Sequence, residues 1–224
     1  MTGEDAPTLD DAALLGAIGA FTHDNLHVEV EGEWEYGVLS VDGWVFEGDP
    51  QLAQQVGTLF RKYVPRGSEW RANHTGLWLD PSAQGRGFGR AFHYYLEELY
   101  REHRIESIVI WAKEVGAYAW HNLGFTLTGD SHAKQCEQSA RIWTAYGGRE
   151  RAQEAVDSGY ITQQRFDEVD RLFAEVEGCH RQALQPSDIA VIGAAEPWDE
   201  GGRSVWLGRL ILTRSEWRGV KKLS

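Results

Sequence analysis

The chain has 224 residues and is acidic: 34 Asp and Glu side chains stand against 22 Lys and Arg, giving a formal net charge of −12 at pH 7. Such a charge repels the phosphates of nucleic acids, and no apolar run approaches the ~20 residues that a membrane span needs. We therefore expect neither a nucleic-acid nor a membrane partner. The length predicts one domain with a large core and room for an appended part.

Cysteine and histidine usage predicts no metal site. The two cysteines, Cys136 and Cys179, form no Cys-x-x-Cys pair, and the eight histidines are scattered without ligand spacing. The N-terminus has neither the cationic start nor the apolar stretch of a signal peptide. We therefore expect reduced thiols and a cytoplasmic location.

The first part of the chain predicts an alternation of helices and strands. In chain order, we expect a helix over 9–21, strands over 26–31 and 33–41, a hairpin turn at Asp42-Gly43 leading to a strand over 44–47, a helix over 51–63 and a strand over 71–80. The strands rest on apolar residues that recur with period two, and the turn on an Asp-Gly pair. The second helix rests on Asp49-Pro50, an N-cap followed by proline in the first turn.

A glycine-rich segment, Gln84 to Arg90, follows the predicted strand over 71–80 and precedes a predicted helix over 90–102. Its three glycines allow a tight turn and a close approach of backbone to ligand. The free N–H groups and the dipole of the following helix attract phosphate, and Arg86 and Arg90 add positive charge. The segment fits neither Gly-x-Gly-x-x-Gly, because residue 90 is Arg, nor a P-loop, which needs Gly-Lys-Ser or Gly-Lys-Thr. We interpret it as a pyrophosphate cradle for a nucleotide-like cofactor.

The rest of the chain continues with a short strand over 106–111, then an aromatic-rich helix that Gly124 would cap, and a further strand reaching about residue 128. Beyond this point we expect helices over 131–146 and 162–184 and short strands over 189–194 and 205–213. One apolar stripe supports the second of these helices.

Two motifs resemble those of the GNAT superfamily of N-acyltransferases. Gln84, Gly87 and Gly89 form a Gln-x-x-Gly-x-Gly pattern like its acyl-CoA signature, and Leu123-Gly124-Phe125 ends a helix like that of its second motif. The resemblance covers about residues 21–129. It implies an α/β fold with a GNAT-like twisted, mixed β-sheet flanked by helices in residues 1–130. Residues 131–224 then form a mainly helical extension, packed on or beside that core, that could shape an acceptor site, an oligomer contact or a partner surface.

The resemblance also implies where the cofactor, acetyl-CoA or another acyl-CoA, would bind. The pantetheine arm would pair with the backbone of Leu77, Trp78 and Leu79. The pyrophosphate would lie on Gln84, Gly85, Arg86, Gly87, Phe88, Gly89 and Arg90. Many members of the superfamily are dimers, so a homodimer is a further expectation from the resemblance.

The catalytic groups are harder to transfer by resemblance. The tyrosine that often protonates the leaving thiolate falls at Trp120, and the usual asparagine falls at Lys113. Tyr118 is the candidate acid, with His121 as a nearby substitute. His74 is the candidate base, because histidine titrates in a range suited to proton transfer; a water chain or a purely structural histidine is the alternative. Strand alternation places His74 on one face with Gly76 and Trp78.

Four glutamates, at positions 29, 31, 33 and 35, would share one face of a strand. They form either a solvated outer face or an anionic rim that recruits a cationic amine. The function expected is CoA-dependent transfer of an acyl group, most simply acetyl, to a primary amine, with a cationic small molecule or peptide as acceptor. The alternatives are a catalytically weak or inactive CoA-binding or partner-binding module, and a structural protein whose glycine loop is only a corner.

Overall fold

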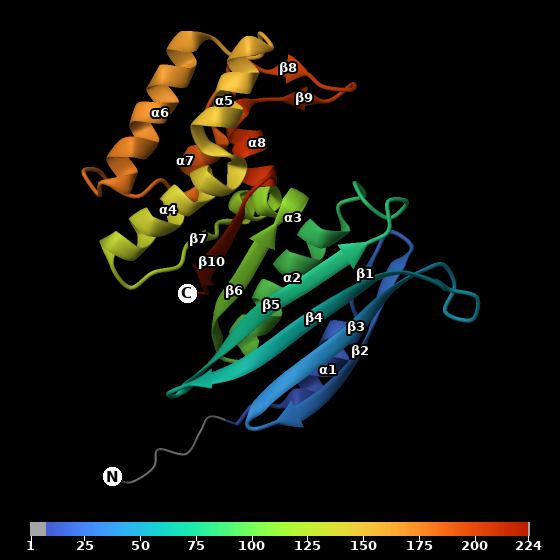
Figure 1. Cartoon of the computed structure of the whole chain (residues 1–224). Helices are drawn as coiled ribbons and strands as arrows, with labels where there is room; N and C mark the ends of the chain where they lie inside the picture. Colours follow the sequence, from blue (N-terminus) through green and yellow to red (C-terminus); the bar gives the residue numbers. More distant parts are fainter. Residues whose placement is uncertain (1–7, 224) are drawn as a thin grey trace, which may run out of the picture. The chain divides into compact units, whose positions relative to one another are not determined.

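A computed structural model of the chain describes residues 8–223 (Figure 1). It divides into two compact units: residues up to Ile110 together with 221–223, and residues 111–220. Among the helices formed by the described residues, none is both long and apolar enough to cross a bilayer.

The first unit is a mixed sheet backed by two helices, α1(Asp11–Gly19) and α2(Phe88–Glu102), on the same face (Figure 1). Its strands lie in the order β1(Thr22–His23), β2(Leu26–Glu35), β3(Val38–Glu47), β4(Gln54–Arg66), β5(Glu69–Leu79) and β6(Ile105–Lys113). Neighbours from β1 to β5 are antiparallel, whereas β5 and β6 are parallel, because the chain crosses over through α2 between them. The expected GNAT-like mixed sheet flanked by helices is confirmed.

The helix predicted over 51–63 is wrong, because these residues belong mostly to β4. Asp49-Pro50 forms a turn, in which the Leu52 amide donates to the Asp49 carbonyl oxygen at 2.9 Å. Val56 is a bulge, since Gln55 pairs with Phe46 and Gly57 with Val45. The bulge puts the buried residues Val56 and Leu59 three positions apart, a spacing typical of a helix rather than of a strand.

The hairpin between β2 and β3 turns at Tyr36-Gly37, not at the predicted Asp42-Gly43. Tyr36 and Gly37 both have positive φ, 49° and 76°, as a two-residue type I′ turn requires. Gly43 lies within β3, where an added β-carbon would be 2.8 Å from the Leu59 side chain. The glycine thus serves close packing there, so the Asp-Gly signal was misleading.

The second unit is mainly helical, as expected of the C-terminal part. Its elements are α3(Glu114–Ala119), a 3₁₀ helix η1(Trp120–Leu123), β7(Thr126–Leu127), α4(His132–Tyr146), α5(Gly148–Asp157), α6(Gln163–Glu177), α7(Pro186–Ala190), β8(Trp198–Asp199), β9(Ser204–Val205), α8(Leu207–Thr213) and β10(Glu216–Lys222). The ring of Trp143 on α4 stacks on that of Phe173 on α6 with centroids 4.6 Å apart. This stacking joins the two longest helices of the unit.

Side-chain caps confirm the starts of the two long predicted helices: Ser131 caps α4 and Thr162 caps α6. The second helix ends at Glu177, however, and not near residue 184. The strands predicted over 189–194 and 205–213 are wrong. Residues 189 and 190 end α7 and the next four residues form turns, whereas α8 occupies most of the second segment. Short apolar runs do not distinguish a strand from a buried helix, and on α8 the buried residues Leu207 and Ile211 are one helical turn apart.

Candidate acyl-CoA site

The glycine loop turns sharply into α2. Gly85 and Gly87 have φ values of 75° and 84°, and Gly87 is the N-cap of a helix that begins at Phe88, two residues earlier than predicted. The Ala91 amide makes the first bond of the helix, to the Gly87 carbonyl oxygen at 3.0 Å. The amides of residues 88–90 therefore precede the intrahelical bonds and point out of the helix end, where a phosphate would accept from them.

The loop leaves open space next to these amides. A β-carbon added at Gly85 would meet nothing within 4 Å, and one at Gly89 would make only an ordinary contact, 3.6 Å from Leu77 Cδ2. Gly89 is therefore not required by its protein neighbours. Its lack of a side chain keeps the N-terminus of α2 accessible to a ligand.

Side chains fix the loop to the sheet. The Gln84 amide donates to the Leu79 carbonyl oxygen at 2.8 Å, which ties the loop to the end of β5. The Arg86 guanidinium binds Asp24 at 2.5 Å and Glu47 at 2.6 Å, and it also contacts Asn25. The hydrogen bond from Arg86 holds the pKa of Glu47 below its ordinary value. Arg86 is thus bound to acidic neighbours, and its charge is largely compensated before any ligand arrives.

Arg90 is the loop cation with the freer side chain. It is exposed, lies 5.7 Å from the ring centroid of Tyr94, and takes part in none of the ion pairs found among residues 8–223. A cation in the first turn of α2, next to three outward-pointing amides, is suited to a phosphate.

The strand before the loop has an unusual edge. Its parallel pairing with β6 begins where Trp70 pairs with Ile105 and ends where His74 pairs with Ile110. Among the described residues, no residue of β5 after His74 pairs with β6. On its other edge, β5 stays paired with β4 as far as Leu79. Residues 77–79 therefore have one edge without a β6 partner, which suits hydrogen bonds to an extended, amide-containing arm such as pantetheine. Of their backbone groups, the Leu79 carbonyl oxygen already accepts from Gln84.

A bulge at Thr75 changes which face these residues occupy. His74 pairs with Arg61 and Gly76 with Phe60, so Thr75 has no partner of its own on β4. His74 is 4% exposed, whereas Trp78 is 58% exposed and its ring covers Gly76. The predicted placement of His74 on one face with Gly76 and Trp78 is therefore wrong, because the extra residue breaks the period-two alternation.

His74 lies in a buried polar network. Its Nε2 is 3.0 Å from the Tyr100 hydroxyl, which is 2.9 Å from the Tyr63 hydroxyl. Burial, followed by the charge of Arg61, holds the pKa of His74 well below its ordinary value. Burial also raises the pKa of Tyr100 to about 12. His74 is therefore a neutral imidazole in the core at physiological pH.

Arg61 is a site residue that the sequence reasoning missed, because it lay in a segment predicted as helix. It is 3% exposed, and its guanidinium donates to the carbonyl oxygens of Gly76, at 2.5 Å, and Phe60, at 2.8 Å. These bonds join both strands at the Thr75 bulge. Arg61 thus positions the part of β5 that precedes Leu77.

Tyr118 lies in the second unit, on α3. Its ring is half-buried, 4.6 Å from that of His121 and 5.8 Å from that of Trp206. It lines a pocket of about 580 Å³ together with Glu200 and several arginines: Arg203, Arg209 and Arg214. The neighbouring Trp120 instead packs its ring against Phe125, 5.3 Å away. A phenol in a cationic pocket is a chemically reasonable proton donor.

Comparison with known proteins agrees with the fold. Residues 54–125 match the model of the acetyltransferase (GNAT) family. No curated protein sequence matches the chain significantly. This matched segment holds β4, β5, the glycine loop, α2, β6 and the helix that ends at Gly124.

Several solved structures are similar over part of the chain. The KacTA–DNA complex has 19% identity and a TM-score of 0.34, over 41% of this chain and 62% of that one. Naa50 of Arabidopsis thaliana, in complex with the bisubstrate analogue CoA-Ac-MVNAL, has 14% identity and a TM-score of 0.34. That match covers 39% of this chain and 58% of the Naa50 chain. AtaTR bound with AcCoA has 15% identity and a TM-score of 0.35, and the match covers 48% of this chain and 89% of that one. The chain thus spans about 60% of the length of the first two. The match to the acetyltransferase (GNAT) family is thus a match of residues 54–125, and it covers less than half of the chain.

Proposed function

We propose that the chain is a CoA-dependent N-acyltransferase, most simply an acetyltransferase, that acts on a primary amine. The observation that carries the proposal is the continuity of two features. The available edge of β5 at Leu77–Leu79 leads directly into a loop whose amides open at the N-terminus of α2. The pantetheine arm of an acyl-CoA would lie along this edge of β5, and its pyrophosphate would bind the amides at the N-terminus of α2.

In the proposed reaction, a neutral amine attacks the thioester carbonyl carbon. A C–N bond forms, the C–S bond breaks, the amine loses a proton, and the CoA thiolate gains one. We propose Tyr118 as the donor of that last proton. For His74, burial and the bond to Tyr100 favour a structural role.

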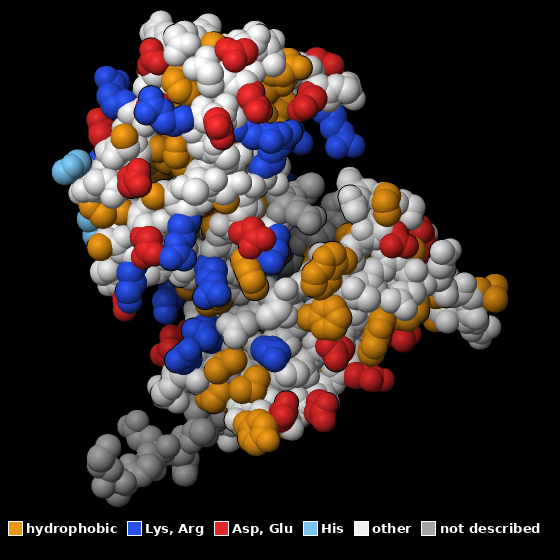
Figure 2. Space-filling model, in the orientation of Figure 1, with side chains coloured by type: hydrophobic (Ala, Val, Ile, Leu, Met, Phe, Trp, Pro, Cys, Tyr) orange, Lys and Arg blue, Asp and Glu red, His pale blue; other side chains and the backbone are white. Residues whose placement is uncertain are grey.

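Two surfaces bear on the acceptor, and their charges differ. Glu29, Glu31, Glu33 and Glu35 are exposed along β2, and Figure 2 shows several acidic side chains over the strands of the first unit. They support a cationic acceptor. The arginines around Tyr118 favour instead an acceptor that carries a carboxylate beside its amine. An amine panel should therefore include polyamines, aminoglycoside-like compounds, lysine and peptide N-termini, each assayed by release of the CoA thiol from acetyl-CoA.

A CoA-binding module without turnover is the second candidate. Trp120 stands where the family often has tyrosine, and Lys113, where asparagine is usual, is bound to Glu216 at 3.5 Å. Thermal stabilisation by CoA with no thiol release across the panel would support this candidate. Absence of any CoA binding would contradict both.

Replacing Tyr118 with phenylalanine is expected to lower kcat by about 100-fold, because general acid catalysis contributes on that order or more. The KM for acetyl-CoA should change little, since the ring and its contacts remain. Steady-state kinetics on the best acceptor would measure both. Tyr36→Phe, at a position 97% exposed in the β2–β3 hairpin, is the matched control. An unchanged kcat in Tyr118→Phe would remove Tyr118 as the acid without touching CoA binding.

A further inference from the structure

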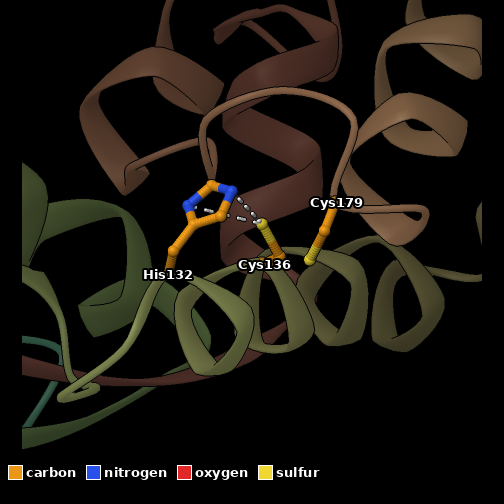
Figure 3. Close-up of side chains that lie close together, drawn as sticks. All are labelled: His132, Cys136 and Cys179. Atoms are coloured by element: carbon orange, nitrogen blue, oxygen red, sulfur yellow. Dashed lines mark hydrogen bonds between the residues drawn. The ribbon is translucent and has the colours of Figure 1, made fainter.

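Three possible metal ligands meet within the second unit (Figure 3). His132 and Cys136 lie one turn apart at the start of α4, and Cys179 follows the end of α6. One ligand atom from each lies within 4.8 Å of the other two. The two cysteines are far apart in sequence and do not form a spaced motif, so only the His-x-x-x-Cys spacing on a helix could have signalled the cluster.

The distances suit tetrahedral coordination. Zinc bonds of about 2.3 Å to sulfur and about 2.0–2.1 Å to nitrogen, at tetrahedral angles, place sulfur and nitrogen about 3.6 Å apart. Cys136 Sγ lies 3.5 Å from His132 Nε2. Rotation of the exposed Cys179 and His132 side chains would bring the remaining pairs to similar separations, since both can move into solvent-facing space.

The backbone at Cys179 is an independent observation. The Cys179 amide bonds to the Val176 carbonyl oxygen at 2.9 Å, and the His180 amide bonds to that of Glu175 at 2.8 Å, which together form a Schellman motif. Cys179 occupies its left-handed position with φ of 53°, where glycine is strongly favoured. The chain has a glycine, Gly178, but one residue too early. A cysteine is therefore held in a strained conformation that directs its thiol toward α4 (Figure 3).

The segment after Cys179 is held against the face of α4 that carries Cys136 and Ser139. Cys136 Sγ approaches the Arg181 carbonyl oxygen at 3.8 Å, and the buried Ser139 hydroxyl donates to the Leu184 carbonyl oxygen at 2.7 Å. These contacts hold the loop that carries Cys179 beside Cys136, so the ligands are largely pre-positioned.

We propose that His132, Cys136 and Cys179 bind one zinc ion, with water in the fourth position, and that the ion ties the N-terminus of α4 to the C-terminus of α6. A Cys₂His set is a soft nitrogen and sulfur environment that suits Zn²⁺. The site is independent of acyl transfer, because none of its residues lies on the loop or strand assigned to acyl-CoA.

The test is a zinc titration of the reduced, metal-free full chain, in competition with a chromophoric chelator. Cobalt(II) serves as a spectroscopic substitute that reports thiolate ligands. We expect one equivalent of zinc per chain, thiolate-to-cobalt charge transfer, and a higher Tm with zinc. Cys136→Ser and His132→Ala should each weaken binding by at least 10-fold. His180→Ala, which removes an exposed imidazole adjacent to the cluster, should leave the affinity unchanged.

Cys179→Gly separates loss of a ligand from loss of folding. It should raise the Tm of the metal-free chain, because glycine relieves the left-handed strain, while zinc binding falls by at least 10-fold. Three results would overturn the proposal: no stoichiometric zinc binding by the wild type, an affinity that Cys136→Ser does not change, or a Cys136–Cys179 disulfide that forms equally fast with and without zinc.

Discussion

Replacing Gly89 with glutamate is expected to weaken acetyl-CoA binding by about 100-fold or more. The new carboxylate would lie in the first turn of α2, beside the amides proposed to hold the pyrophosphate. Two like charges about 4 Å apart repel by about 4 kcal/mol at an effective dielectric constant near 20, and exposure to solvent reduces this value. Isothermal titration calorimetry of acetyl-CoA and of free CoA into both proteins would measure the loss.

Gly89 is a better position for this test than Gly87. Its backbone is helical and a β-carbon there makes no clash, so folding should be unaffected. An acidic residue in the first turn also interacts favourably with the helix dipole, so the Tm should stay the same or rise slightly. Gly16→Glu introduces the same charge at an exposed glycine of α1, where an added β-carbon would meet nothing within 4 Å, and should leave CoA affinity intact. Full affinity in Gly89→Glu would show that the pyrophosphate lies elsewhere.

The first unit is expected to lose stability steeply as the pH falls below about 6.5. Burial keeps His74 neutral in the folded chain and lowers the pKa of His93, which is bonded to Glu97, to about 4. In the unfolded chain both imidazoles take up a proton near pH 6.5. The unfolded state then binds more protons, so the free energy of unfolding falls as the pH falls, by about 1.4 kcal/mol per pH unit for each histidine. Urea unfolding between pH 5 and 7 measures this slope.

The slope, rather than the stability at one pH, identifies the responsible groups. His74→Gln and His93→Gln should each remove about half of the slope, even where the substitution also changes stability at pH 7. His180→Gln should keep the full slope, because this histidine is exposed. The other charges beside the two imidazoles are those of Arg61, Glu97 and Lys221, which both substitutions leave in place. Slopes unaffected by His74→Gln and His93→Gln would contradict this account.

The sequence predicted best where a local rule decides the structure. Ser131 and Thr162 cap the helices that they were expected to begin, and Gly124 ends η1 with φ of 81°. The glycine loop and its position between strand and helix were also predictable, because the turn needs residues that tolerate positive φ. The motif at Leu123-Gly124-Phe125 then placed the surrounding order of elements correctly.

The sequence failed where packing between strands decides. A bulge at Val56 made β4 resemble a helix, and Gly43 marked a close contact instead of a turn. For the same reason Arg61 was not recognised as a residue that positions β5. The pairing of Arg86 with Asp24 and Glu47 was equally hidden, since it joins residues distant in sequence.

The bulge at Thr75 has a consequence for how β5 tolerates change. Because side chains alternate between the two faces of a strand, the extra residue reverses which positions face inward after the bulge. Deleting a single residue there would restore one continuous alternation along β5 and exchange the orientations of Leu77 and Trp78. The strand can thus accept many substitutions at exposed positions such as Thr75, but its length between His74 and Leu77 is fixed by the arrangement of the proposed cofactor site.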